Sequence, residues 1–305
     1  MPISHFVDAK LGDAHSLEEA VGYFEDAGIC PGEVVQAVIE DRDDIRRSWM
    51  HISPSMMDPD KNCRRELVIA RTVDYGMDPL SMWSAYEGTA WHKAFNLFGK
   101  DIKGWHREYP LPGPSDAHNP YVRKVEREGQ TFYELEVFPG LWISGIADRV
   151  REDFKVISDF KSTNYPWTPK FEGTPRDYAE DQIKSFSIQI NLYARAIELL
   201  KGVRPEERWV WRIYRGSRDK RYTFRKMPIP FIPPTQLEEL VREHSETSLA
   251  FLRQAHDAEP GAAREAVIAS IPMDGKDKRM YNDKKCSLYC PVKDICYGIA
   301  GLTVF

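Results

Sequence analysis

The sequence lacks an apolar run long enough to cross a bilayer, and its N-terminus has no charged region followed by an apolar stretch. We therefore expect no membrane span and no signal peptide, and a protein that works in the cytoplasm. The chain also lacks an excess of positive charge, because its formal net charge is -5. This value argues against a protein coated in positive charge for bulk nucleic-acid attraction, although a local basic groove stays compatible with it.

Cysteine is sparse, with five residues in 305. In a reducing compartment, a cysteine cluster holds a metal more often than it forms disulfides. Three of the five gather near the C-terminus, one lies far upstream, and we expect the remaining one, Cys30, to be a small buried hydrophobe. The four candidate metal ligands are Cys63, Cys286, Cys290 and Cys296.

The chain is long enough for one large domain with an appendage or for two modest ones. Residues 1–50 are predicted to be a helical N-terminal extension. Ser16 and Glu19 fit a capping box for a first helix, and a second helix is expected over about 32–49. Two helices joined by a short turn fit a helix-turn-helix, but the pattern is common and favours a helical cap on the main domain.

Two strand-like runs in the middle of the chain each carry a carboxylate. Asp148 lies in the first run, and Asp159 and Lys161 lie in the second. Because alternate residues of a strand point to one face, Asp159 and Lys161 project together. Two carboxylates that hold a divalent cation, with an ammonium beside them, suit metal-assisted phosphodiester hydrolysis.

The turn between these runs raises a geometric problem. A plain three-residue loop, Arg151–Asp153, pairs Val150 with Phe154 and therefore Asp148 with Val156. For Asp148 and Asp159 to meet at one ion, the strands must bend, bulge or be offset.

Around this hairpin the periodicity predicts further elements. A helix over 178–200 places Gln189 and Tyr193 four residues apart on one face. His92 falls on another helix; a lone histidine is usually a core or surface residue. The other expected elements are a short helix from Ser53, helices over 82–97, 235–258 and 262–270, strands over 105–109, 131–138 and 209–214, an otherwise loop-like segment over 99–130, and a loop over 273–296.

The segment from Arg212 to Lys226 is predicted to be a very basic strand-turn-strand. One interpretation is a solvated edge of the sheet. The other is an edge that follows the phosphates of a nucleic acid near the site. The sequence leaves both open.

The order of these motifs resembles the PD-(D/E)XK nuclease superfamily, and within it the RecB-like exonucleases, over roughly residues 51–300. The resemblance implies a domain over 51–305 with a restriction-endonuclease-like α/β core, in which helices flank a central mixed β-sheet. It implies that Mg2+ or Mn2+ is held by His92, Asp148, Asp159 and the backbone carbonyl of Phe160. It also gives Lys161 a role at the attacking water, and Gln189 and Tyr193 a role in orienting the lysine or the DNA.

The cysteine spacing resembles that of the iron-sulfur subset of this group, which includes the AddB-type and the CRISPR-associated adaptation nucleases. This resemblance implies a 4Fe-4S cluster that clasps Cys63 to the three late cysteines, and thiolates suit such a cluster. The first gap, between Cys286 and Cys290, has three residues where relatives show two. Structural Zn2+ is the alternative, although the usual Cys-x-x-Cys knuckle is absent.

We therefore expect a metal-dependent DNA exonuclease that acts on single-stranded or free DNA ends in recombination, repair or phage DNA processing, in a bacterial or phage-infected cytoplasm. Recombination proteins are possible partners. The alternatives are a non-catalytic DNA-binding subunit of a recombination or CRISPR adaptation complex, and a nuclease directed at RNA.

Overall fold

The fold is described from a computed structural model. It describes residues 3–7, 14–27, 35–36, 52–59, 62–73, 75–77, 102–127, 129–163, 178–214, 224–272, 290 and 292–299. The chain divides into two compact units. The first comprises Met1–His51, Asn62–Glu87 and Thr247–Phe305, and the second comprises Ile52–Lys61 and Gly88–Glu246.

The first unit contains a small sheet of order β2-β1-β3, in which β1 and β3 run parallel. Arg65, which is buried, joins two of its helices: Nε donates to the carbonyl of Ile271 at 2.8 Å, and Nη2 to that of Ala269 at 2.9 Å. These carbonyls lie at the end of a helix, where a cation is favoured. The elements of this unit are β1 (Ile3–Val7), β2 (Ala14–His15), α1 (Leu17–Asp26), α3 (Arg64–Thr72), β3 (Tyr75–Met77), α7 (Ala262–Ser270) and α10 (Lys293–Ile299).

The second unit contains two sheets. The larger has the strand order β11-β10-β9-β8-β4, and among its pairs only β9 and β10 are parallel. The smaller is antiparallel, with the order β5-β6-β7. The strands are β4 (Trp105–Leu111), β5 (Val122–Arg127), β6 (Gln130–Phe138), β7 (Leu141–Ile143), β8 (Gly145–Arg151), β9 (Val156–Thr163), β10 (Glu207–Tyr214) and β11 (Phe224–Pro228).

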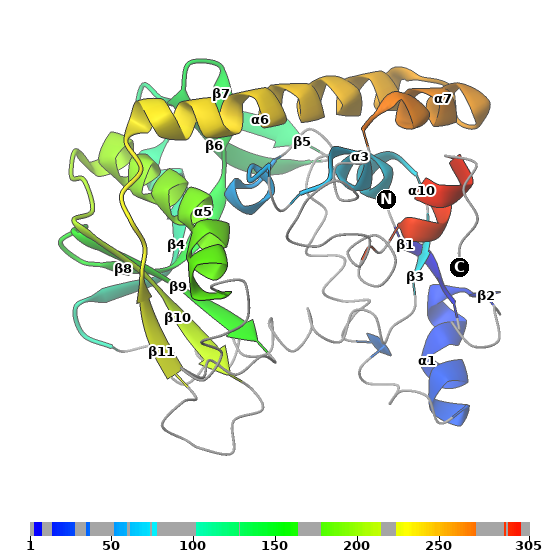
Figure 1. Ribbon diagram of the computed structural model, residues 1–305, viewed down its shortest axis with the longest axis horizontal. Coiled ribbons are helices and arrows are strands. Elements are labelled where there is room, and N and C mark those ends of the chain that lie inside the picture. The colour runs from blue at the N-terminus through cyan, green and yellow to red at the C-terminus, as the bar shows by residue number, and fades with distance from the viewer. Residues whose placement is uncertain are drawn as a thin grey trace. The chain divides into compact units, whose positions relative to one another are not determined.

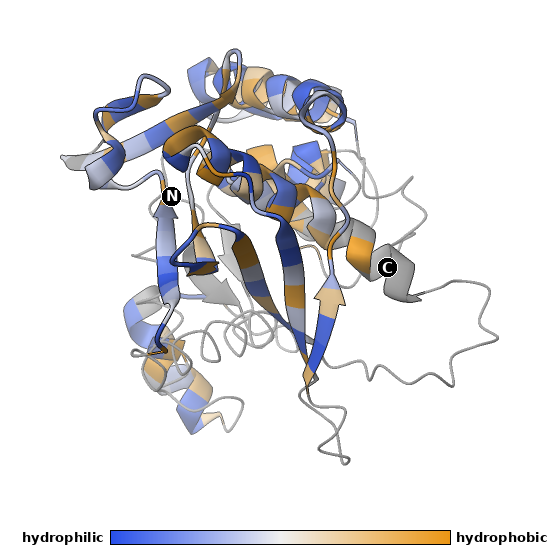
Figure 2. Ribbon diagram, turned by 90° about the vertical axis from the view of Figure 1, so that its left-hand side faces the viewer, coloured by the Kyte–Doolittle hydropathy of each residue, from blue (hydrophilic) through white to orange (hydrophobic). Residues whose placement is uncertain are grey.

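Helix α5 (Tyr178–Lys201) connects the two parallel strands and packs against both of them (Figure 1). Parallel neighbours need such a crossover. Ile190 and Ile197 of α5 are fully buried, as are Ile157 and Val210 of the strands. Burying each such side chain contributes about 1.5–3 kcal/mol. Hydrophobic and hydrophilic bands alternate along the strands (Figure 2), so one face of the sheet receives the helix.

The remaining described elements are short or connect the units. The 3-10 helices are η1 (Pro54–Met56), which contacts α5, and η3 (Pro114–Asp116). Helix α6 (Pro234–Asp257) belongs to the second unit up to Glu246 and to the first from Thr247. None of the helices that the structure describes combines the length and apolar character needed to cross a bilayer.

Several predictions of secondary structure are confirmed. Ser16 and Glu19 form the capping box at the start of α1, and the predicted helices over 178–200, 235–258 and 262–270 correspond to α5, α6 and α7. Strands over 105–109, 131–138 and 209–214 are also present as β4, β6 and β10. The helix expected over 32–49 is described only at 35–36, and the helix over 82–97 lies outside the described residues.

Other predictions of secondary structure are wrong. Residues 1–50 are not purely helical, because β1 pairs with β3 and β2. The segment 99–130, expected to be loop apart from one strand, also forms β5, which pairs with β6. The short helix from Ser53 is a 3-10 turn without a side-chain cap. Cys296 lies on α10 rather than in a loop. The strands β1 and β5 were not predicted because they depend on pairing with other segments, and a local sequence pattern does not encode such pairing.

Candidate active site

The register of β8 and β9 brings the two central carboxylates level. Val150 is opposite Ile157, and Arg149 is opposite Ser158. Continuing this register by one residue places Asp148 opposite Asp159. The predicted three-residue loop, which would pair Asp148 with Val156, is therefore wrong. The strands are instead offset by three residues. An offset was one of the options that the sequence left open.

The turn explains the offset. Phe154 has a φ of +59°, a left-handed conformation that ends the strand pattern there. Its ring stacks on His106 with centroids 5.5 Å apart and meets Tyr109 edge-on at 5.8 Å. These ring contacts offset the free-energy cost of the left-handed backbone conformation at Phe154. An apolar residue that resembled the first residue of a strand is therefore part of the turn.

Next to the backbone pairs of β8 and β9, a side chain of β8 bonds to the backbone of β9. Asp148 Oδ2 accepts a hydrogen bond from the backbone N–H of Phe160 at 2.7 Å. A backbone donor that is shielded from water needs a partner, and here the carboxylate of Asp148 accepts from the part-buried N–H. This bond ties Asp148 directly to the strand that bears Asp159.

Asp159 and Lys161 lie together as the alternation of the strand predicts. Lys161 Nζ is 2.5 Å from Asp159 Oδ2 in an ion pair. Asp159 is 3% exposed, and its Oδ2 is the oxygen that faces the ammonium of Lys161. A buried carboxylate oxygen in this state is suited to a cation.

The charges of the site perturb one another. Burial raises the pKa of Asp159 to about 7, the neighbouring Asp148 adds to the rise, and Lys161 opposes it. Burial lowers the pKa of Lys161, but Asp159 and Asp148 outweigh it and raise the pKa above its ordinary value. Two carboxylates that share a buried position repel each other unless a cation joins them.

Helix α5 contributes the buried Gln189 and Tyr193 from one face. Gln189 Nε2 lies 3.4 Å from the phenol oxygen of Tyr193, to which it donates. Burial, reinforced by Asp159, raises the pKa of Tyr193 to about 12, so this group remains a phenol. Both residues thus lie where the sequence predicted, although their roles stay predictions.

Gly145, three residues before Asp148, has a structural role that the sequence did not reveal. A Cβ at Gly145 would lie 2.9 Å from Cε1 of Tyr193 and 3.1 Å from its phenol oxygen. Only a residue without a side chain permits this approach between β8 and α5. The absence of a side chain at Gly145 therefore allows Tyr193 to pack against β8 beside the site.

Phe186 is a further residue that sequence reasoning missed. Its ring on α5 lies 6.0 Å from Lys161 Nζ and 5.3 Å from Cζ of Arg212 on β10. The helical position of Phe186, three residues before Gln189, was the available signal. Aromatic faces attract cations at such distances.

The donor set fits a hard divalent cation. Asp148 and Asp159 supply carboxylate oxygens, the ligands that Mg2+ and Mn2+ prefer. His92 lies outside the described residues, and the role of the Phe160 carbonyl stays a prediction. Among the described residues, no group of three or more His, Cys, Asp or Glu side chains is arranged to hold a metal ion.

The candidate cluster ligands belong to the first unit. Cys63 is the residue before α3 and is buried, Cys296 is buried on α10, and these two helices are in contact. Burial raises the pKa of Cys290, and Glu66, Cys63 and Cys296 raise it further. Cys286 lies outside the described residues. The iron-sulfur clasp is accordingly not shown.

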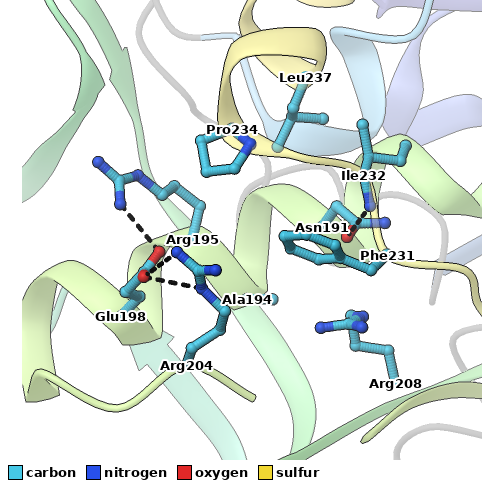
Figure 3. A pocket seen from close by; sticks show the side chains of 10 residues that line it. All are labelled: Asn191, Ala194, Arg195, Glu198, Arg204, Arg208, Phe231, Ile232, Pro234 and Leu237. Carbon is cyan, nitrogen blue, oxygen red and sulfur yellow. Dashed lines mark hydrogen bonds and ion pairs between the residues drawn. The ribbon is translucent and has the colours of Figure 1, made fainter. Parts of the chain in front are cut away.

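A second charged group lies on the last turns of α5 (Figure 3). Glu198 accepts hydrogen bonds from Arg195 Nη1 at 2.8 Å and from Arg204 Nε and Nη2 at 2.8 and 2.6 Å. Burial raises the pKa of Glu198, but these two guanidinium groups outweigh it and hold the pKa below its ordinary value.

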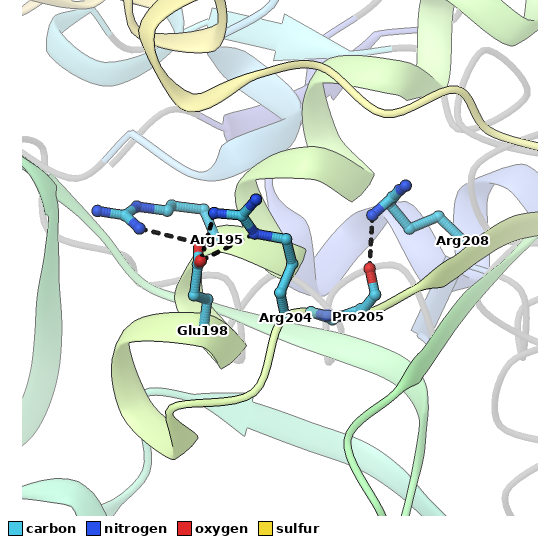
Figure 4. Close-up of polar contacts among 5 residues, drawn as sticks. All are labelled: Arg195, Glu198, Arg204, Pro205 and Arg208. Carbon is cyan, nitrogen blue, oxygen red and sulfur yellow. Dashed lines mark hydrogen bonds and ion pairs between the residues drawn. The ribbon is translucent and has the colours of Figure 1, made fainter.

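A third arginine completes this group. Arg208 Nη1 donates to the carbonyl of Pro205 at 2.6 Å (Figure 4). The guanidinium groups of Arg204 and Arg208 lie 5.4 and 5.0 Å from the ring of Phe231. Together with neighbouring residues they line a small pocket formed by Asn191, Ala194, Arg195, Glu198, Arg204, Arg208, Phe231, Ile232, Pro234 and Leu237.

The comparisons with known proteins agree with the geometry. A model of the PD-(D/E)XK nuclease superfamily matches residues 59–297, which is more than half of the chain. The chain belongs to the PD-(D/E)XK nuclease superfamily. The matched range spans Asp148, Asp159 and Lys161. Nucleases of this superfamily are typically metal-dependent phosphodiesterases, so a divalent metal and a nucleic-acid substrate follow at that level.

Individual relatives add little to the superfamily assignment. No curated protein matches the chain. Among solved structures, the crystal structure of SSO0001 is similar, with 12% identity and a TM-score of 0.38 over 70% of this chain and 84% of that one.

Proposed function

We propose that this PD-(D/E)XK protein is a metal-dependent exonuclease that hydrolyses phosphodiester bonds at DNA ends, with single-stranded DNA in its site. The observation that supports this proposal best is the convergence of Asp148, Asp159 and Lys161 on one face of β8 and β9, beside Tyr193. RecB-like function in recombination, repair or phage DNA processing belongs to the same proposal.

Asp148 and Asp159 would hold Mg2+ or Mn2+, together with His92 and the Phe160 carbonyl. When bound, the metal neutralises charge and polarises the scissile phosphate. The Phe160 N–H keeps Asp148 oriented, at the 2.7 Å contact described above. Because Asp148 and Asp159 repel each other when both are charged, the pair would favour a cation bound between them.

Lys161 contributes the positive charge of the site. Its ion pair with Asp159 fixes the ammonium beside the carboxylates. There it positions the attacking water and stabilises the charge that develops on the phosphate. Gln189 and Tyr193 keep the lysine or the DNA backbone in place, because their side chains are buried and bonded to each other.

The test is cleavage of end-labelled single-stranded and double-stranded DNA with Mg2+, Mn2+ or EDTA. We expect cleavage only with metal, and a loss of about 10²–10³-fold in kcat for Lys161→Ala, the size of loss seen when one group that stabilises the transition state is removed. A parallel RNA substrate measures the preference for DNA. Cleavage in EDTA, or undiminished cleavage by Lys161→Ala, would contradict the proposal. DNA binding without cleavage under every metal would favour a non-catalytic subunit.

A separate readout tests the metal site itself. In the absence of DNA, Mn2+ is expected to raise the melting temperature of the wild type, because a ligand that binds only the folded state stabilises it. The double variant Asp148→Asn, Asp159→Asn should lose this rise. An equal rise in both proteins would place the metal elsewhere.

We also propose a 4Fe-4S cluster on Cys63, Cys286, Cys290 and Cys296. The burial of Cys63 and Cys296 and the contact between their helices support it. Anaerobically purified protein should be brown and contain iron and sulfide, and Cys63→Ser should be colourless. Colourless wild type with stoichiometric zinc would favour the zinc alternative.

A further inference from the structure

Arg212 is the neighbour of Lys161 on the next strand. The parallel register of β9 and β10 pairs Lys161 with Arg212 and Asp159 with Val210. Paired residues on adjacent strands project from the same face of a sheet. Arg212 therefore emerges on the face that bears the carboxylates, one strand away from the catalytic lysine.

The helix above this face contacts Arg212. Cζ of Arg212 lies 5.3 Å from the ring centroid of Phe186, and the same ring lies 6.0 Å from Lys161 Nζ. Phe186 is buried. The ring thus lies between α5 and both cations, and it limits where the guanidinium of Arg212 can point.

Arg212 has no counter-ion of its own in the described part of the chain, where it forms no ion pair with a carboxylate. Its side chain is half-buried, and this burial lowers the pKa of the guanidinium to about 10. Asp159, the carboxylate of the adjacent strand, is already paired with Lys161. A guanidinium that is desolvated without an anion costs free energy.

The row of cations continues to the edge of the sheet. Arg212 is paired with Arg225 on β11, the outermost strand on that side, and Arg225 is exposed. Lys161, Arg212 and Arg225 therefore form one row across three neighbouring strands, which we call the cation row. Within this row, Arg212 has no carboxylate partner among the described residues, so an anion bound beside it would compensate its charge.

We propose that Arg212 and Arg225 bind phosphates of the nucleic-acid strand that flank the scissile phosphate, so that the strand crosses β10 and β11 beyond Lys161. The proposal rests on the proposed function for the identity of the ligand. Arginine suits the role, because its planar fork matches two phosphate oxygens and it stacks on aromatic rings. Neighbouring strands bring the two guanidinium groups close enough for one backbone to pass both.

The direct test is binding in EDTA, where no cleavage occurs. The anisotropy of a fluorescein-labelled oligothymidylate gives Kd at a series of salt concentrations for wild type, Arg212→Gln and Arg225→Gln. We expect Kd to rise on the order of tenfold for Arg212→Gln and less for the exposed Arg225. Each variant should lower the slope of log K against log salt by about 0.7, the value for one phosphate contact on a single strand.

Two further variants separate a phosphate contact from a general loss of charge or folding. Arg212→Lys keeps the charge without the fork, so its salt slope should match the wild type while its Kd lies between those of wild type and Arg212→Gln. Arg204→Gln removes one cation that Glu198 already pairs, and its Kd and slope should stay unchanged. Melting temperatures verify that each variant is folded.

The outcomes distinguish this inference from the proposed function. A wild-type slope and Kd in Arg212→Gln, an equal loss in Arg204→Gln, or no salt-dependent binding by the wild type would overturn the inference. Failure of the wild type to cleave with any metal would instead overturn the proposed function, and the binding experiment would still report on Arg212. If cleavage occurs, Arg212→Gln should raise KM more than it lowers kcat.

Discussion

Helix α5 carries two charged regions that differ in how their charges are satisfied. Around Gln189 and Tyr193 it covers Asp159, whose pKa burial raises to about 7. In its last turns it carries Glu198, whose pKa is lowered, because two arginines outweigh burial. Both regions mix carboxylates with cations, yet the shifts have opposite signs.

The difference shows what each region needs from outside the chain. Glu198 is bonded to Arg195 and Arg204, so its negative charge is compensated internally. Asp159 shares one lysine with Asp148 nearby, and Arg212 has no carboxylate partner in the described part of the chain. A metal cation would compensate the carboxylates around Asp159, and a phosphate anion would compensate Arg212. A region with incomplete charges is where ligand chemistry is expected.

The largest expected effect comes from neutralising Asp159, and the matched control is Glu198, the carboxylate of the other region. Asp159→Asn should lower kcat by about 10²–10³-fold, as loss of one transition-state group does. In EDTA it should also raise the free energy of unfolding, because a carboxylate with a raised folded pKa is destabilising at neutral pH. Glu198→Gln should leave cleavage unchanged. Urea unfolding and single-turnover cleavage measure both quantities; equal effects of the two variants would remove the contrast.

A smaller effect is expected at the contact between β8 and α5. Gly145→Ala places a Cβ within 2.9 Å of Tyr193, which is only 5% exposed and has little room to move. Overpacking of this kind costs about 1–3 kcal/mol. Gly22→Ala is the matched control: its Cβ meets nothing within 4 Å in α1, so it should stabilise by about 0.5–1 kcal/mol. Equal unfolding energies for both variants would show that the contact with Tyr193 does not matter.

The smallest effect concerns the ion pairs of Glu198. The Glu198→Gln variant should lose no more than about 1 kcal/mol, because partly exposed pairs contribute little. Since the folded pKa of Glu198 is depressed, its contribution is present above the unfolded value of 4.5 and is lost as pH falls through the folded pKa. Unfolding at pH 7 should therefore separate the two proteins, and unfolding well below pH 4 should not. A pH-independent difference would contradict the ion pairs as its cause.

The sequence predicted the local parts of this site well. The alternation that places Asp159 beside Lys161, and the helical spacing that places Gln189 beside Tyr193, each depend on one element. These local patterns could not predict the three-residue offset between β8 and β9. It depends on the left-handed turn at Phe154 and on the packing of its ring against His106, a residue from β4.

Long-range pairing was the other limit. The placement of Arg212 beside Lys161 follows from the parallel register across the crossover, which no local pattern encodes. The strand β1 likewise depends on β3, which lies far along the chain. Basic residues after β10 were visible in the sequence, but the row they form was not.

The crossover through α5 also has a consequence for the order in which the site assembles during folding. The β8–β9 hairpin brings Asp148 and Asp159 together through local contacts, which form early. The pairing of β9 with β10 must await closure of the segment that contains α5, since loop closure precedes its contacts. We therefore expect the acidic half of the site to form first and the cation row to close later, which hydrogen exchange during refolding would resolve in time.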